Sequence, residues 1–153
     1  MFIINEISNE KIKVSISEIE VNELEKLTGF QFDWENEIDF EVFKLYSKKS
    51  NEIHGLISIA RIFEELRIEI RLIELSKVNI GSKRKFSRIA GILIAFACKE
   101  AFSNGFYGFV SLIPKTRLIE HYQNKYGFIQ FGKHLAVELK SSENLMNKYL
   151  SND

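Results

Sequence analysis

The chain has 153 residues, which is the size of one domain, so we expect a single domain over residues 1–153. An apolar fraction of 45% beside a charged fraction of 27% excludes an intrinsically disordered chain. The longest apolar run, Ile89 to Cys98, is half as long as the roughly 20 residues that span a bilayer, so no membrane segment is expected.

The cysteine content and the N-terminal sequence predict a compartment. Cys98 is the single cysteine and cannot form an intramolecular disulfide, in agreement with a reducing environment. No basic segment followed by an apolar one opens the sequence, so we expect a cytoplasmic protein. Because Cys98 lies in an apolar segment, we expect a small core residue rather than a nucleophile.

The net charge is zero, but the charges are unevenly distributed. Residues 1–40 contain ten acidic and three basic side chains, whereas residues 77–88 contain five basic side chains and no acidic one. This pattern predicts one region that attracts cations and one loop that attracts anions, although a solvated basic turn is an equally simple interpretation. Nucleic acid is a weak candidate partner because the pI is near 6.9 and no second basic stripe is present.

The first half of the sequence predicts strands with one short helix. Alternation around Ile12 to Ile16 favours a strand, and Ser17 to Glu20 has the pattern of a capping box that opens a helix ending before Gly29. An aromatic, acidic connector follows over residues 30–34. Three further strands are expected over residues 40–46, 53–63 and 66–78, and their short polar connections favour an antiparallel meander.

In the second half the apolar period changes from two to about 3.6 residues. Residues 85–103 predict a buried helix, residues 107–112 a buried parallel strand, and residues 115–126 a second helix. Closing strands are expected over residues 129–131 and 135–139, followed by a short helix over residues 145–150.

The segment His121 to Phe128 carries the most specific motif. Gly127 suits the position just past a helix, where the chain takes a left-handed conformation, and Phe128 begins a strand. With Tyr122 near the helix end, the segment resembles the xYxKxGF signature of the GNAT superfamily of acyl-CoA-dependent N-acyltransferases. The resemblance extends over about residues 40–139. It implies an α/β (α+β) fold with a mixed, mostly antiparallel central sheet flanked by helices, and acetyl-CoA as the donor.

The turn before Ile89 is the candidate phosphate site. A helix N-terminus presents unpaired N–H groups and partial positive charge, and the turn is basic. It matches the superfamily's pyrophosphate loop, [Arg/Gln]-x-x-Gly-x-[Gly/Ala], with Lys85 and Ala90 conforming and Arg88 in place of the first Gly. We expect Arg88 to offset the cost of a left-handed backbone by pairing with the pyrophosphate. The cofactor-binding residues that the resemblance implies are Leu75, Ser76, Lys77, Val78, Lys83, Arg84, Lys85, Phe86, Ser87, Arg88, Ile89, Ala90 and Lys115.

The resemblance also implies a reaction, in which a primary amine attacks the thioester directly in a ternary complex. Tyr122 is then the group that protonates the leaving sulfur or donates a hydrogen bond to it, and the backbone of residues 75–78 binds the pantetheine and the oxyanion. Glu74 is the first candidate for the general base, with Glu69 or a chain of waters as alternatives. The three histidines are too far apart in the sequence to suggest a metal set.

Two other functions remain open from the sequence. A GNAT-fold module that binds CoA or regulates without turnover is supported by Arg88 in the phosphate loop, and a nucleic-acid-associated protein by the basic loop. The expected acceptor is a small amine or a lysine-like side chain, attracted by Asp33, Glu35 and Glu37 beside the aromatic residues 30–34. A homodimer is also conceivable.

Overall fold

The computed structural model describes residues 1–114 and 119–152. Over these residues the chain alternates strands, helices and short 3-10 turns. The elements are β1 (Phe2–Asn5), β2 (Lys11–Glu18), α1 (Val21–Glu25), η1 (Trp34–Glu37), β3 (Glu41–Ser47), β4 (Ile53–Ile62), η2 (Phe63–Glu65), β5 (Arg67–Leu75), η3 (Lys77–Asn79), β6 (Phe86–Ser87), α2 (Ile89–Ser103), β7 (Val110–Leu112), α3 (Ile119–Tyr126), β8 (Ile129–Phe131), β9 (His134–Val137) and α4 (Leu139–Tyr149).

The described strands form one sheet in the order β6-β1-β2-β3-β4-β5-β7-β9-β8. Neighbouring strands are antiparallel except for β5 and β7, which are parallel and are joined through α2. Their pairing runs only from Ile68 opposite Val110 to Ile70 opposite Leu112. Beyond Ile70, β5 continues to Leu75 without a described partner on that side, so the sheet is open there.

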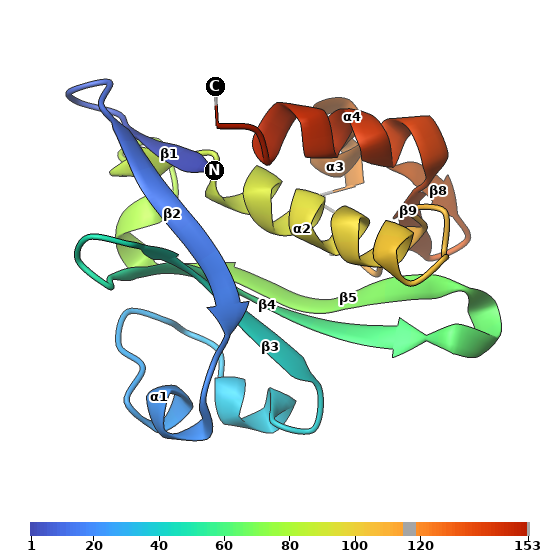
Figure 1. Cartoon of the computed structure of the whole chain (residues 1–153), viewed down its shortest axis with the longest axis horizontal. Helices are drawn as coiled ribbons and strands as arrows, with labels where there is room; N and C mark the ends of the chain where they lie inside the picture. The colour runs from blue at the N-terminus through green and yellow to red at the C-terminus, as the bar shows by residue number, and fades with distance from the viewer. Residues whose placement is uncertain (115–118, 153) are drawn as a thin grey trace.

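The helices cover the sheet unequally. Figure 1 shows α2, α3 and α4 over one face and α1 on the opposite side. The larger core lies between α2 and the sheet, and it includes Ile57, Ile68 and Leu93. A smaller core on the other face packs Leu24 of α1 and Trp34 of η1 against the sheet. Among the described residues no helix is long and apolar enough to cross a membrane.

Two irregularities in strand pairing determine what faces the open part of the sheet. Between β3 and β4 the register passes from Gly55 to Ile53, so His54 is an extra residue and its side chain is fully buried. Between β4 and β5 the register passes from Leu72 to Ile70, so Arg71 is the extra residue. Such bulges change the direction of the side chains that follow them.

The antiparallel meander predicted from the sequence is confirmed, since β3, β4 and β5 pair in succession. The strand predicted around residues 12–16 is β2, and the left-handed Gly127 is confirmed by a φ of 76°. The expected parallel strand is β7, although it is shorter than residues 107–112. The fold class is confirmed as a mixed α/β fold with a mostly antiparallel sheet flanked by helices.

Three predicted helix starts were wrong. The capping box of α1 is formed by Glu20 and Glu23 rather than Ser17, because β2 continues through residue 18 to pair with β3. Helix α2 begins at Ile89 rather than residue 85, because residues 86–87 pair with β1 as β6. Helix α4 begins at Leu139 rather than residue 145, and β1 was not predicted.

Candidate functional site

Two cavities meet beside the end of β5. The first, which we call the α2 cavity, has a volume of about 220 Å³, and the second, the Tyr122 cavity, has about 340 Å³. Leu75 and Ile80 line both, so the two cavities adjoin at this pair of side chains. The α2 cavity is lined by Leu75, Asn79, Ile80, Gly81, Arg84, Phe86, Ser87, Arg88, Ile89, Ala90, Gly91, His121, Lys125, Tyr126 and Tyr149.

The N-terminus of α2 points into the α2 cavity. Ile92 donates its backbone N–H to the Arg88 carbonyl at 3.0 Å, which is the first bond of the helical ladder. The backbone N–H groups of residues 89–91 have no acceptor within the helix, because the residues four positions before them lie outside it. All three residues line the cavity, so it combines free backbone donors with the positive end of the helix. An anion is the ligand that this geometry favours.

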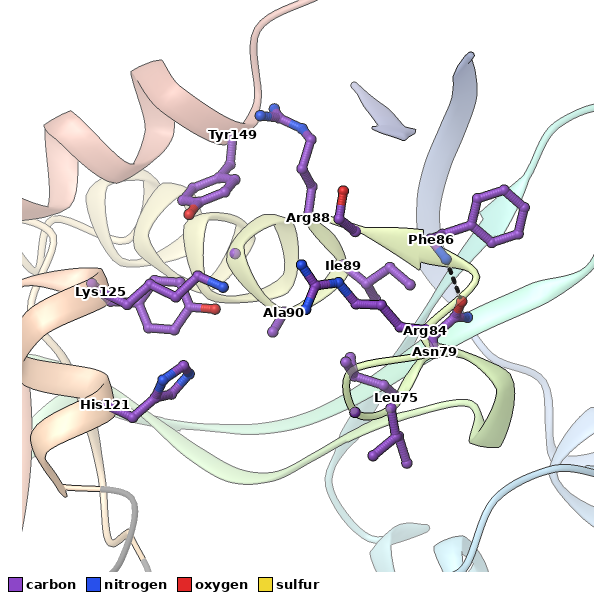
Figure 2. A pocket seen from close by; sticks show the side chains of 15 residues that line it. Leu75, Asn79, Arg84, Phe86, Arg88, Ile89, Ala90, His121, Lys125 and Tyr149 are labelled. Atoms are coloured by element: carbon purple, nitrogen blue, oxygen red, sulfur yellow. Dashed lines mark hydrogen bonds between the residues drawn. The ribbon is translucent and has the colours of Figure 1, made fainter. Parts of the chain in front are cut away.

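Nitrogen-bearing side chains enter the α2 cavity from two separate parts of the chain. Arg84 comes from the loop before β6 and is paired with Glu6, at 2.9 Å from its NH2 nitrogen. His121 and Lys125 come from one face of α3, because residues four apart lie one above the other on a helix. Figure 2 shows the α3 side chains on one side of the cavity and Arg84 on the other.

Arg88 has the backbone conformation of a glycine but turns its side chain away from the cavity. Its φ is 81°, in the left-handed region. The guanidinium donates to the carbonyls of Phe2 at 3.2 Å and Lys148 at 3.1 Å, and lies over the Phe2 and Tyr149 rings. Figure 2 shows it directed toward the end of α4. The expected compensation for the left-handed backbone therefore comes from contacts within the protein.

Helix α4 forms one wall of the α2 cavity through Tyr149. A Cβ atom built on Gly91 would lie 2.3 Å from the Tyr149 ring, so the absence of a side chain at Gly91 allows this contact. Tyr149 also contacts the Tyr126 ring, with 6.2 Å between ring centroids. The first turn of α2 is thus packed against α4 at the place where its N–H groups are free.

The loop between β5 and β6 is attached to the sheet by buried polar side chains. Asn79 accepts from the Phe86 N–H at 3.1 Å and donates to Ser76 Oγ at 2.7 Å and to His54 Nδ1 at 3.4 Å. His54 Nε2 is 2.7 Å from Ser47 Oγ. Burial lowers the pKa of His54, which favours the neutral ring.

The Tyr122 cavity occupies the opening between β5 and β7. It is lined by Gln31, Phe32, Ile70, Arg71, Leu72, Ile73, Glu74, Leu75, Ile80, Leu112, Ile113, Pro114 and Tyr122. Ser76 donates its N–H to the His54 carbonyl on the β4 side. Because neighbouring residues of a strand point their backbone groups to opposite sides, Ile73 and Leu75 direct theirs into the opening. The cavity therefore contains strand N–H and C=O groups without a strand to pair with.

Tyr122, in the middle of α3, is held by other aromatic rings. Its ring centroid lies 5.6 Å from Phe128 and 5.9 Å from Tyr126. Burial raises the pKa of the Tyr122 phenol above its ordinary value, so the hydroxyl remains a donor at neutral pH. The motif residue thus presents a protonated phenol at the Tyr122 cavity.

Glu74 is buried, and its carboxylate accepts three hydrogen bonds. Its Oε1 accepts from the Phe32 N–H at 3.2 Å and from the Trp34 indole at 2.8 Å, and its Oε2 accepts from the Gln31 N–H at 2.6 Å. The carboxylate thereby fixes residues 31–34 to β5. Each carboxylate oxygen has two acceptor positions, so Oε2 keeps one.

The structure gathers only some of the predicted site residues. Leu75, Arg84, Phe86, Ser87, Arg88, Ile89 and Ala90 line the α2 cavity, and Tyr122 and Glu74 line the adjoining one. Ser76, Lys77 and Val78 line a different cavity, beside α1 and the β3–β4 turn, and the N–H groups of Ser76 and Lys77 are bonded within the protein. Lys83 and Lys85 are exposed, and Lys115 lies outside the described residues.

Sequence reasoning missed His121, Lys125, Tyr149 and Asn79. The spacing of four between His121 and Lys125 was a usable signal, because it places both on one helix face. Tyr149 carried no signal, since its role depends on how α4 packs. Cys98 is a fully buried core residue as expected, and burial raises the pKa of its thiol to about 12. Within residues 1–114 and 119–152, no group of three potential metal ligands occurs.

Comparison with known proteins identifies the fold. No protein-family model matches the sequence, and no curated protein matches it significantly. Solved structures do match. A spermidine N-acetyltransferase SpeG chimera from Vibrio cholerae and hSSAT has a TM-score of 0.61 at 13% identity, over 91% of this chain and 99% of that one. AtaTR bound with acetyl-CoA has a TM-score of 0.58 at 12% identity, over 86% and 97%. A Bacillus subtilis acetyltransferase in complex with CoA has a TM-score of 0.56 at 16% sequence identity, and the match covers 84% of this chain and 99% of that one. The chain therefore has the fold of these acetyltransferases, which is the GNAT fold that the Tyr122 motif led us to expect.

Proposed function

We propose that the protein is an acetyl-CoA-dependent N-acetyltransferase that transfers the acetyl group to a primary amine by direct attack in a ternary complex. The observation that carries the proposal is that the two cavities adjoin at Leu75 and Ile80, which line both. One end offers helix N–H groups and cations, and the other offers a protonated phenol beside an open strand edge. A ligand with a pyrophosphate at one end and a thioester at the other fits this arrangement, with the pyrophosphate at the helix N-terminus and the thioester beside the phenol.

In the proposed complex the pyrophosphate of acetyl-CoA binds at the first turn of α2, with Arg84 and Lys125 as cationic partners. Arg84 would exchange part of its contact with Glu6 for the phosphate, since guanidinium groups bind phosphate with two parallel hydrogen bonds. The pantetheine then follows the open edge of β5 past Leu75, and the thioester arrives beside Tyr122.

The chemistry requires one proton acceptor and one proton donor. As the amine nitrogen forms its bond to the carbonyl carbon, the carbon–sulfur bond breaks and the sulfur takes a proton from the Tyr122 hydroxyl. The raised pKa of Tyr122 keeps that proton in place until the thiolate forms. We assign the amine proton to the unused acceptor position on Oε2 of Glu74, directly or through a water.

A second function, a CoA-binding or regulatory module with little or no turnover, is favoured by the contacts of Glu74. Three hydrogen bonds and an exposed fraction of 7% suit a carboxylate that supports a loop. The N–H groups of Ser76 and Lys77 are likewise engaged, which leaves Ile73 and Leu75 as the strand donors for an oxyanion.

Calorimetric titration with CoA tests the donor site. We expect Arg84→Ala with Lys125→Ala to weaken CoA binding by well over tenfold, because both lost cations line the α2 cavity. Lys83→Ala with Lys85→Ala is the matched control, since it removes the same charge from positions that do not line the α2 cavity. A larger loss in the control pair would contradict this placement and return the phosphate site to the basic loop itself.

Release of free thiol from acetyl-CoA, measured over a panel of small amines and a lysine-containing peptide, separates the two functions. An active enzyme releases thiol only when a suitable amine is present. Tight CoA binding without thiol release from any amine would support the binding module instead.

A further inference from the structure

Arg71 occupies an unusual position at the Tyr122 cavity. It is the extra residue of the bulge between β4 and β5, and it lines the cavity from the strand that also carries Leu75. Leu75 is four positions further along the strand than Arg71, which corresponds to about 13 Å. Arg71 is therefore at the end of the cavity remote from the α2 cavity, where an acceptor, rather than the donor, would bind.

The contacts of Arg71 orient its guanidinium and leave part of it available. The group lies over the Phe40 ring, with its central carbon 3.5 Å from the ring centroid. Its Nε donates to Glu37 at 3.1 Å. No other hydrogen bond to a described side chain engages its two terminal nitrogens. A stacked guanidinium keeps its edge free, and that edge matches the geometry of a carboxylate.

Three acidic groups in this region accept hydrogen bonds within the fold. Glu37 is paired with Arg71 and its side chain is only 12% exposed. Asp33 accepts from the Glu35 N–H at the start of η1, and Glu74 accepts three hydrogen bonds. Of the three carboxylates expected from the sequence to attract a cationic acceptor, Asp33 and Glu37 are thus engaged within the fold.

The remaining lining of the cavity is mostly apolar. Ile80 and Ile113 line it although each is about half exposed, at 54% and 53%. Apolar side chains left open at a cavity favour a ligand with an apolar body. Among the residues described at this cavity, Arg71 is the sole cation.

We propose that the acceptor is an amine that also carries a carboxylate and an apolar body, such as a hydrophobic amino acid, with the carboxylate bound by Arg71. This inference rests on the proposed function, because it assigns the amine end to the space beside Tyr122. The apolar body contacts Ile80 and Ile113, and Arg71 selects against acceptors that carry a second positive charge in place of the carboxylate.

The test compares two product analogues that differ in one charge, N-acetyl-L-leucine and N-acetyl-L-leucinamide, by calorimetry on the protein saturated with CoA. We expect the acid to bind at least tenfold more tightly than the amide. Arg71→Ala should remove the difference, and Arg71→Lys should restore part of it. Arg67→Ala is the control, because Arg67 is on the same strand but lines a separate cavity. Equal binding of acid and amide by the unmodified protein, or a difference that persists in Arg71→Ala, would overturn the inference.

Glu37→Gln distinguishes this model from steering of a cationic acceptor. Removing the charge that faces Arg71 should leave binding of N-acetyl-L-leucine unchanged or tighter, whereas a weaker complex would contradict the role of Arg71. In turnover, leucine should exceed both leucinamide and spermidine, and a preference for spermidine would also overturn the inference. If CoA itself does not bind, the proposed function fails, and the same titrations on the free protein still decide whether Arg71 binds the carboxylate.

Discussion

Asn79 accepts a hydrogen bond from the backbone N–H of Phe86 at 3.1 Å, across the loop formed by residues 80–85. The same side chain donates to Ser76 on the near side of that loop. A backbone bond from Lys85 N–H to the Val78 carbonyl at 2.8 Å closes the loop beside it. One buried amide therefore joins the end of β5 to the start of β6, and it fixes the loop that carries Arg84 to the α2 cavity.

Asn79→Ala should destabilise the protein by about 1 to 3 kcal/mol, because it leaves the buried Phe86 N–H without its acceptor. It should also weaken CoA binding severalfold, since Arg84 is no longer held beside the cavity. Chemical denaturation and calorimetry measure the two effects. Asn22→Ala, on the exposed side of α1, is the control and should change neither. An unaltered free energy of unfolding for Asn79→Ala would show that the loop is held by its backbone bonds alone.

His54 should make the stability of the protein sensitive to mild acid. Burial lowers its pKa in the folded state, so the unfolded chain binds a proton first as the pH falls below about 6.5. The native state binds fewer protons there, and stability decreases as the pH falls toward the folded pKa. A proton on Nδ1 would also face the Asn79 amide group. Glu52 favours and Lys85 opposes the charged ring.

Unfolding curves between pH 5 and 7 test the role of His54. We expect His54→Gln to be less stable than the unmodified protein at pH 7 and to lose less stability on acidification. Parallel pH dependence in the two proteins would assign the acid sensitivity to carboxylates elsewhere.

The sequence predicted the elements whose pattern is local. Strand alternation identified β2 to β5, and the 3.6 period identified α2, because in these segments one face meets the core throughout. The errors came from distant partners. Residues 86–87 form β6 because β1 pairs with them, and Arg88 takes a left-handed φ because strand β1 and helix α4 supply its hydrogen bonds. The residues around positions 86–88 contain no pattern that predicts either of these long-range contacts.

The candidate site was predicted in the same uneven way. Tyr122 was found because its motif is contiguous, and Arg84 because it lies in a basic run. Lys83 and Lys85 belong to that run but point to solvent, since an irregular loop gives no period from which to infer direction. Arg71 gave no signal at all, because its place at the Tyr122 cavity depends on a bulge in the pairing of β5.

If acetyl transfer is confirmed, Tyr122→Phe should lower turnover by roughly 10²-fold while leaving CoA affinity nearly unchanged, since general acid catalysis contributes about 10² to 10⁴. The substitution keeps the ring contacts with Tyr126 and Phe128 and removes only the hydroxyl. Steady-state rates and calorimetry on the same preparations check it. Equal turnover in the two proteins would leave Tyr122 with a packing role.

Cys98 should lower stability at high pH without affecting activity. Its pKa rises from 9.0 to about 12 in the folded protein because the thiol is buried. Above pH 9 the unfolded thiol ionises while the native one keeps its proton, so stability falls by up to about 1.4 kcal/mol per pH unit. Cys98→Ala should therefore lose less stability than the unmodified protein between pH 8 and 10. Rapid reaction of the native thiol with a thiol reagent at pH 8 would contradict its burial.

The effect of Gly91→Ala on the free energy of unfolding should depend on the residue at position 149. The substitution should destabilise the protein that has Tyr149 and stabilise the Tyr149→Ala variant. In the unmodified protein the new Cβ would lie 2.3 Å from the Tyr149 ring, so the ring must leave its present position at the α2 cavity. We expect a loss of about 1 to 3 kcal/mol, the usual cost of overpacking, and weaker CoA binding. In a Tyr149→Ala background the clash is absent, and Ala at a helix position should then be about 1 kcal/mol more stable than Gly. A double-mutant cycle by denaturation measures the coupling between the two positions. Additive effects of the two substitutions would show that α4 does not pack on the first turn of α2 in solution.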